Sequence, residues 1–235
     1  ISDLSAMCDA IYGRHNIDLI IADGAPNLEY SEEDYQEVHA QKIILAEIIS
    51  CLECLKRHGN FVLKIFDTFT RFSRCVVFLI TKLFNEVYII KPPSSRITNS
   101  EKYLIGKDLM IMDEKRQDLL ANLHIILFNF KDTYNCEEFI SLDRDCRFEQ
   151  TFEAALIKLA EDQRDSLKKI LDEIDYRIFK VEPPKNNKEK GKGKTKGKGK
   201  GKENSKRVEP YYIKQNTEIL KEKEYSPFEE ESLFP

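Results

Sequence analysis

The stretch Asn60-Phe-Val-Leu-Lys-Ile-Phe-Asp67 is the clearest strand in the chain. Its apolar residues run almost without a break, and a helical pattern lies on either side, which predicts a buried strand. One lysine, Lys64, interrupts this apolar run. A lysine is rarely buried unless another group pairs with it or uses it. Two interpretations stay open at this point: a strand-end lysine whose ammonium reaches water, or a catalytic lysine that acts as a base.

Apolar runs and helical spacings alternate on both sides of this strand. Further strands and helices are expected at Ile17–Asp23 (strand), about Val38–Arg57 (helix), Phe72–Phe84 (helix), Val87–Ile90 (strand) and Lys102–Ile105 (strand). The alternation predicts a doubly wound α/β sheet, in which ligands gather at the carboxyl ends of the strands. Asp23 and Lys64 both fall at or near such ends, which favours a functional role for Lys64.

The remainder of the chain predicts helices and then a stretch of low complexity. Asp113–Phe130 and Phe148–Phe179 have the apolar spacing of helices, and Pro183 follows them. We therefore expect four parts, namely the sheet at 1–109, a helical extension that packs on it at 110–182, a disordered Lys/Gly-rich linker at 183–207 and a tail at 208–235.

The size and composition of the chain set the class of protein. With 235 residues, 41% of them hydrophobic, the chain can bury one sizeable core. No apolar run approaches the roughly 18 residues of a membrane-spanning helix, so the sequence predicts no membrane partner. The chain begins at Ile1 rather than at a methionine, and we expect it to be a segment of a longer protein.

The six cysteines give little indication of a metal site. Cys51 and Cys54 form a C-x-x-C pair inside a helical pattern, and no second pair completes a zinc site. We expect buried or helix-surface thiols rather than metal ligands. Scattered thiols without a disulfide framework are typical of a reducing compartment such as the cytosol or nucleus.

The net charge of −4 conceals a strong asymmetry. Lys185–Arg207 holds 11 Lys/Arg and 2 Asp/Glu, a balance of +9, which leaves −13 for the rest of the chain. Such a tract could raise RNA affinity through counterion release, or serve as a nuclear address. It could equally be a solubilising low-complexity linker, and the sequence does not decide between these interpretations.

Three acidic or basic residues occur in a suggestive order. Asp23 stands in Ala-Asp-Gly-Ala-Pro-Asn, Lys64 in Val-Leu-Lys-Ile-Phe-Asp, and Glu101 in Ser-Arg-Ile-Thr-Asn-Ser-Glu-Lys-Tyr, with spacings of 41 and 37 residues. Alone, the aspartate would be an ordinary cap and the glutamate ordinary surface. Together, over about Ile17–Lys107, the three resemble the FtsJ-like ribose 2′-O-methyltransferase family.

That resemblance implies a Rossmann-like sheet, S-adenosylmethionine as methyl donor, and a Lys-Asp-Lys-Glu tetrad. On this chain the tetrad would comprise Lys64 as general base, Asp23 orienting it and bordering the transferring methyl group, and Glu101 holding the pair of lysines. The first lysine and the Gly-rich cofactor loop would lie upstream of Ile1. A ribose hydroxyl is a poor nucleophile, so a base and a fixed approach to the methyl donor suit this chemistry.

Within the family, two strings are similar to those of mRNA cap methyltransferases. They are Lys64-Ile-Phe-Asp-x-Phe-Thr-x-x-Ser73 and Lys91-Pro followed by Ser95-Arg96-x-x-Asn-Ser100-Glu-Lys-Tyr103. The similarity implies methylation of the first transcribed nucleotide of capped mRNA in the nucleus, with the cytoplasm as alternative. Other capping or transcription proteins would be the partners. Arg96, with Ser95 and Ser100, would then contact phosphate or ribose oxygens, although Arg96 could also be an ordinary surface arginine.

One string departs from the cap type. Gly24-Ala-Pro-Asn27 is more similar to the rRNA enzymes, because the cap type usually continues Ala-Asp-Gly with a second glycine. An FtsJ-like rRNA or tRNA methyltransferase is therefore an alternative. A non-catalytic FtsJ-like module that binds RNA or a partner is a third interpretation, which the presence of Asp23, Lys64 and Glu101 disfavours.

Overall fold

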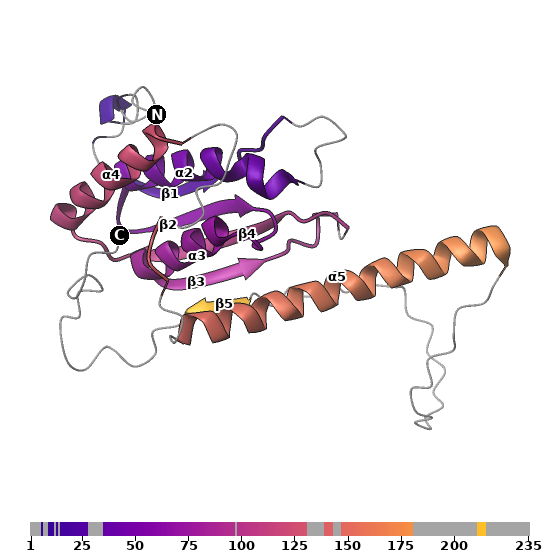
Figure 1. The fold of residues 1–235 in the computed structure, drawn as a ribbon. Coiled ribbons are helices and arrows are strands. Elements are labelled where there is room, and N and C mark those ends of the chain that lie inside the picture. The colour runs from indigo at the N-terminus through magenta and orange to yellow at the C-terminus, as the bar shows by residue number, and fades with distance from the viewer. Residues whose placement is uncertain are drawn as a thin grey trace, which may run out of the picture.

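The computed structural model describes residues 6, 9–11, 13, 15–27, 35–96, 98–130, 139–142, 147–180 and 211–214. Figure 1 shows a sheet, with helices packed against it and one long helix extending beyond it. In chain order the named elements are β1 (Ile17–Ala22), α2 (Gln36–Cys54), β2 (Leu55–Ile65), α3 (Arg71–Leu83), β3 (Phe84–Ile90), β4 (Lys102–Leu109), α4 (Asp113–Phe128), α5 (Arg147–Phe179) and β5 (Tyr211–Lys214).

The five strands form one mixed sheet in the order β1-β2-β4-β3-β5. β1 and β2 are parallel, as strands joined by a helix must be. β4 lies between β2 and β3 and runs antiparallel to both. The mixed α/β sheet confirms the predicted Rossmann-like fold class. The antiparallel insertion of β4 is a feature that the strand–helix alternation did not reveal.

The core lies on one face of the sheet. α2 packs against β1 and β2, α3 packs against β3 and β4, and α4 packs on α2. Alternate strand residues point toward these helices because the side-chain period of a strand is two. The core face includes Phe61, Leu63, Val87, Ile89 and Leu104. On the opposite face of β1, Leu19 and Ile21 are about half exposed, at 49% and 64%.

The helix α2 ends, and the strand β2 begins, earlier than the sequence predicted. We expected the helix to reach about Arg57, whereas α2 ends at Cys54 and β2 starts at Leu55. The first part of β2 is irregular: His58 has a positive φ of 65°, and the β1–β2 register shifts between Leu55 and Asn60. Regular pairing resumes at Asn60, the residue at which the sequence placed the start of the strand.

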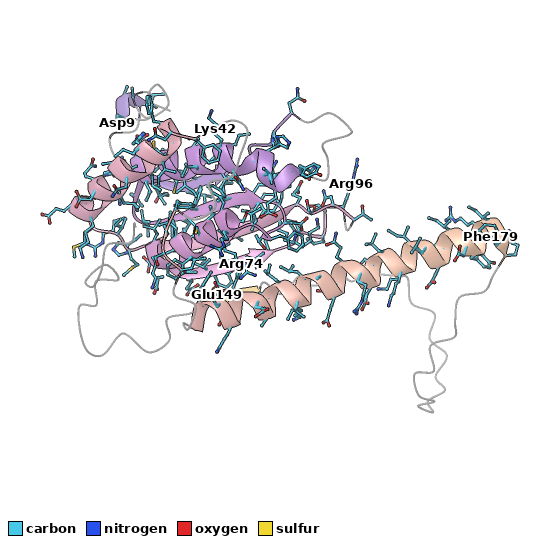
Figure 2. All side chains as sticks on the ribbon, in the orientation of Figure 1. Asp9, Lys42, Arg74, Arg96, Glu149 and Phe179 are labelled. Atoms are coloured by element: carbon cyan, nitrogen blue, oxygen red, sulfur yellow. The ribbon has the colours of Figure 1, made fainter. Side chains whose placement is uncertain are left out.

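The helices after the sheet behave differently from one another. α4 packs against α2 along its apolar side, whereas α5 contacts the rest of the molecule mainly through its first turns, where Phe152 is fully buried. The rest of α5 extends past the sheet to Phe179 (Figures 1 and 2). Large apolar side chains are exposed along this part, namely Leu167, Ile170, Leu171, Ile174, Ile178 and Phe179. Within the described ranges no helix has the length and apolar character needed to cross a membrane.

Two other expectations can be compared with the structure. Cys51, Cys54 and Cys75 are buried thiols that form no disulfide, as expected for core cysteines. Part of the predicted tail forms β5, which pairs antiparallel with β3 at the edge of the sheet. The Lys/Gly-rich tract at 185–207 lies outside the described residues. The predicted division into four parts stays a prediction.

Candidate active site

The site is built on one row of residues across the sheet. Lys64 pairs directly with Tyr103 of β4, and Ala22 pairs with Leu63, so that Asp23 is the next position along β1. All three lie on the face opposite the core, because their neighbours Leu63 and Leu104 are core residues. The sheet therefore brings together two residues that the sequence singled out and one that it did not.

Lys64 is buried, and its ammonium group is held by Asp23. Its exposed fraction is 8%. Its Nζ donates to the backbone carbonyl of Asp23 at 2.8 Å and contacts the Asp23 carboxylate Oδ1 at 2.9 Å. A buried lysine needs such partners, because an unpaired buried ammonium would cost several kcal/mol. The structure thus excludes the first interpretation, in which the Lys64 ammonium extends into water.

Asp23 and Tyr103 complete this row. The hydrogen bond from Lys64 lowers the pKa of Asp23 below its ordinary value. The Tyr103 hydroxyl donates to Asp23 Oδ1 at 3.2 Å. Burial, together with the negative charges of Glu101 and Asp23, raises the pKa of Tyr103 to about 12. Tyr103 is therefore a neutral hydroxyl donor between the two carboxylates at neutral pH.

Glu101 lies beside this row but contacts different groups from those expected. We predicted that it holds the lysines of the tetrad. Among the described residues, its carboxylate Oε1 accepts a hydrogen bond from Ser95 Oγ at 3.2 Å and also interacts with the Tyr103 hydroxyl. Its backbone carbonyl accepts from Lys91 Nζ at 2.7 Å. Glu101 thus connects the 91–101 loop to Tyr103.

Two further lysines hold that loop in place. Lys91 Nζ donates to the backbone carbonyl of Asn99 at 2.8 Å, as well as to its side-chain oxygen. Lys102, buried to the same degree as Lys64, donates to the carbonyl of Ser100 at 2.8 Å and to Asp67 Oδ1 at 3.0 Å. Burial, and then the charge of Lys102, lower the pKa of Lys91 to about 8.

The three predicted RNA contacts lie on the same loop. Arg96 is exposed at the end of the loop that projects from the sheet (Figure 2). The hydroxyl of Ser95 binds within the loop, to Asn99 Oδ1 and Glu101 Oε1. The hydroxyl of Ser100 donates to Gln36 at 3.3 Å. Of these three, Arg96 is the one whose side chain extends into solvent; their role in RNA binding stays a prediction.

The N-terminus of α3 borders the site on the other side. Glu37 of α2 accepts hydrogen bonds from the Thr70 amide at 2.8 Å, the Thr70 hydroxyl at 2.7 Å and the Phe69 amide at 3.2 Å. Thr70 in turn caps α3 through the amide of Ser73. These bonds fix the loop after β2 and leave the Phe69 ring 83% exposed. The backbone beside this ring is therefore held, while the ring itself faces solvent.

The sequence missed Tyr103, Lys91 and Lys102 as site residues. Tyr103 follows Glu101 by two positions, which places both on one face of an extended segment. That signal was present, but it becomes informative only when β4 is known to pair with β2. The lysines looked like ordinary charged residues because nothing in the sequence shows that they are buried.

The groups on this row suit proton transfer. Within the described ranges, no group of three or more His, Cys, Asp or Glu side chains could hold a metal ion. The site instead offers a buried amine at a strand end, an exposed carboxylate beside it and a tyrosine hydroxyl. In its neutral amine form, a lysine in such a place can accept a proton from a substrate hydroxyl that lies within hydrogen-bonding distance.

Residues 3–109 match the family model described as FtsJ-like methyltransferase. This stretch contains β1–β4 with all the site residues above. The fold and the row of Asp23, Lys64 and Tyr103 agree with that class of enzyme.

Three similar proteins carry the same name. A protein of Trypanosoma cruzi is 38% identical over 92 residues, 39% of this chain and 25% of its own length; it is named cap-specific mRNA (nucleoside-2′-O-)-methyltransferase 1. The Trypanosoma brucei and human proteins of the same name are 33% and 32% identical, over 45% and 51% of this chain. The chain spans 28% of the length of the former relative and 14% of the latter.

Proposed function

We propose that the protein to which this chain belongs transfers a methyl group to a ribose 2′-hydroxyl of RNA. We further propose that the substrate is the first transcribed nucleotide of capped mRNA. The buried Lys64 ammonium, which Asp23 holds at the carboxyl ends of β1 and β2, is the observation that carries the proposal. The FtsJ-like match and the name shared by the relatives support it.

Lys64 would be the general base. A ribose hydroxyl hardly ionises at neutral pH, so its proton must be taken up as the oxygen becomes bonded to carbon. The proton would pass to the lone pair of Lys64 Nζ in its neutral amine form, which the Asp23 carbonyl and carboxylate hold in position as hydrogen-bond acceptors. Such positioning contributes as much as the base itself, because the reacting oxygen must lie in line with the carbon that it attacks.

S-adenosylmethionine would supply the methyl group when bound. The residue of this chain that fits next to it is Asp23, whose carboxylate is 61% exposed and carries a lowered pKa, so it stays negative near a cationic sulfonium. Leu19 and Ile21 offer exposed apolar surface on the same face of β1. The residues present are therefore compatible with this cofactor.

Two side chains at the rim of the site suit an RNA strand. Arg96 can contact phosphate oxygens, as an exposed arginine on a loop close to the reacting group would. The exposed ring of Phe69 can stack on a base, which is the common role of such rings in single-stranded nucleic-acid binding. We propose that these two contacts flank the nucleotide whose 2′-hydroxyl reaches Lys64.

We also propose that the protein acts in the nucleus, together with other capping or transcription proteins, since the relatives are named for modifying mRNA caps. The rRNA or tRNA alternative keeps the same chemistry. It is favoured by Gly24-Ala-Pro-Asn27, which differs from the cap-type string.

The decisive measurement is methyl transfer by the full-length protein to matched RNAs. The RNAs would share one sequence and differ in their 5′ end, being capped, uncapped, or capped with a first nucleotide already 2′-O-methylated. We expect incorporation into the first RNA only, with the label at the first transcribed nucleotide. Equal labelling of capped and uncapped RNA would contradict the cap assignment, and label on the premethylated RNA would contradict the position.

A further inference from the structure

A carboxyl group from α2 reaches the turn that follows Asp23. Glu47 Oε1 accepts a hydrogen bond from the backbone amide of Gly24 at 2.8 Å. The approach is close: a Cβ built on Gly24 would lie 2.6 Å from Glu47 Oε1 and 2.7 Å from Ile43 Cγ2. Only glycine allows this contact without displacing a neighbour, so position 24 and the Glu47 side chain depend on each other.

This contact acts on the same peptide group that Lys64 uses. The carbonyl of Asp23 and the amide of Gly24 belong to one planar trans peptide, in which C=O and N–H point in opposite directions. Lys64 Nζ binds the carbonyl end at 2.8 Å, and Glu47 binds the amide end at 2.8 Å. The peptide plane is therefore held from both sides, and with it the Cα from which the Asp23 side chain extends.

The structure also indicates that Glu47 is placed there at a cost to stability. Burial raises the pKa of Glu47 above its ordinary value, although the Gly24 amide and the charge of Lys64 act in the opposite direction. Its second oxygen, Oε2, is buried and has no hydrogen-bond partner among the described residues. A buried polar atom without a partner is unfavourable for folding, so the side chain is not explained by its contribution to stability.

We propose that Glu47 is a positioning residue of the site, which holds the Asp23–Gly24 peptide so that both oxygens of Asp23 that bind Lys64 stay in place. Its role is to place a hydrogen-bond acceptor oxygen at the right distance from the Gly24 amide. Its negative charge is not needed for this role. The proposal rests on the proposed function for its kinetic consequence. The structural part of the proposal, that Glu47 holds the Gly24 amide, does not depend on which reaction the protein catalyses.

Three substitutions in the full-length protein distinguish the effect of the length of the Glu47 side chain from the effect of its charge. Glu47→Gln keeps an acceptor oxygen at the same reach and removes the charge. Glu47→Asp keeps the charge but is one methylene too short, and Glu47→Ala removes both. The matched control is Glu53→Ala on the same helix, whose carboxylate pairs with His124 at 3.0 Å and does not touch the site.

The first readout is methyl-transfer kcat on capped RNA at saturating substrate. We expect the Gln variant to stay within about threefold of the parent, and the Asp and Ala variants to lose on the order of 10- to 100-fold, because small displacements of catalytic groups have effects of that size. The Glu53 control should keep the parental rate. A fully active Ala variant, or a Gln variant as impaired as the Ala variant, would overturn the proposal.

The second readout does not depend on catalysis. Hydrogen exchange of the Gly24 amide, followed by NMR, should become about five- to tenfold faster in the Asp and Ala variants and stay slow in the Gln variant, which corresponds to the loss of one hydrogen bond worth about 1–1.4 kcal/mol. Amides of β2 should keep their exchange rates, which excludes general unfolding. If the parent shows no methyl transfer while Gly24 behaves as expected, the proposed function fails and the positioning role stands; an unchanged Gly24 amide in the Ala variant refutes that role.

Discussion

Lys64 and Lys102 are equally buried, yet their surroundings indicate different roles. Lys64 is placed to take part in a reaction, whereas Lys102 stabilises a loop. Each is 8% exposed, and each pairs with one aspartate. The partner of Lys64 is Asp23, which is 61% exposed at a strand end, whereas Lys102 pairs with the less exposed Asp67 and also binds the loop carbonyl of Ser100. The Lys64 pair thus faces solvent, where a substrate can reach it, and the Lys102 pair closes a loop.

The largest expected effect comes from removing the Lys64 amine. Lys64→Ala in the full-length protein should lower methyl transfer to RNA by about 10²- to 10⁴-fold, the usual contribution of a general base. Lys56→Ala is the control, because Lys56 lies on the same strand and pairs with Asp18 at the surface. Single-turnover kinetics would measure the difference, and a parental rate in the Lys64 variant would refute its role.

Removing Lys102 should affect stability more than chemistry. Lys102→Met leaves Asp67 and the carbonyl of Ser100 without their donor, which we expect to lower the free energy of unfolding by about 1–3 kcal/mol. Urea unfolding of the parent and the variant would measure this. A variant as stable as the parent but as inactive as Lys64→Ala would reverse the roles that we assign to the two lysines.

Lys91 should make the free energy of unfolding depend on pH in the alkaline range. Its pKa is about 8 in the folded protein and about 10.5 when unfolded, so between these values the unfolded state binds more protons and stability rises with pH. Relative to Lys91→Met, the parent should therefore gain stability as pH rises from 8 toward 10.5, and the difference should stay constant well below pH 8, where Lys91 is protonated in both states. Urea unfolding at several pH values would test this; a constant difference between pH 8 and 10.5 would contradict it.

The smallest expected effect is that of the Tyr103 hydroxyl. Tyr103→Phe removes the hydrogen bond to Asp23 but keeps the ring, and the Lys64–Asp23 pair remains. We expect a loss of about two- to tenfold in methyl transfer and a change in unfolding free energy below about 1 kcal/mol. A loss as large as that of Lys64→Ala would show that Tyr103 takes part in proton transfer itself.

Much of the sheet could be predicted from the sequence because apolar runs mark strands wherever one face is buried. The predicted strand at Ile17–Asp23 agrees with β1 within one residue, and the helix predicted at Phe72–Phe84 agrees with α3 within one residue at each end. The start of β2 was wrong because the positive φ of His58 cannot be read from a histidine. The order of β4 between β2 and β3 was missed, since pairing partners depend on long-range packing.

The site was predictable only where a family motif marked it. Asp23 and Lys64 were found, and the structure brings them into contact. Glu47 was missed because it belongs to a helix whose other residues form an ordinary apolar pattern, so its reach to Gly24 follows only from how α2 packs. The roles of Glu101 and Arg96 stay predictions, since their present contacts neither require nor exclude them.

The antiparallel pairing of β4 has a consequence for how this chain can tolerate insertions and deletions. The loop between β3 and β4 lies outside the strands, with several exposed residues, so its length could vary with little effect on the strand pairing. A single residue added within β4 before Gly106 would instead exchange the two faces of the strand, turning Tyr103 toward the core and Leu104 toward the substrate side. Length changes between homologues should therefore fall in the loop and never in the strand.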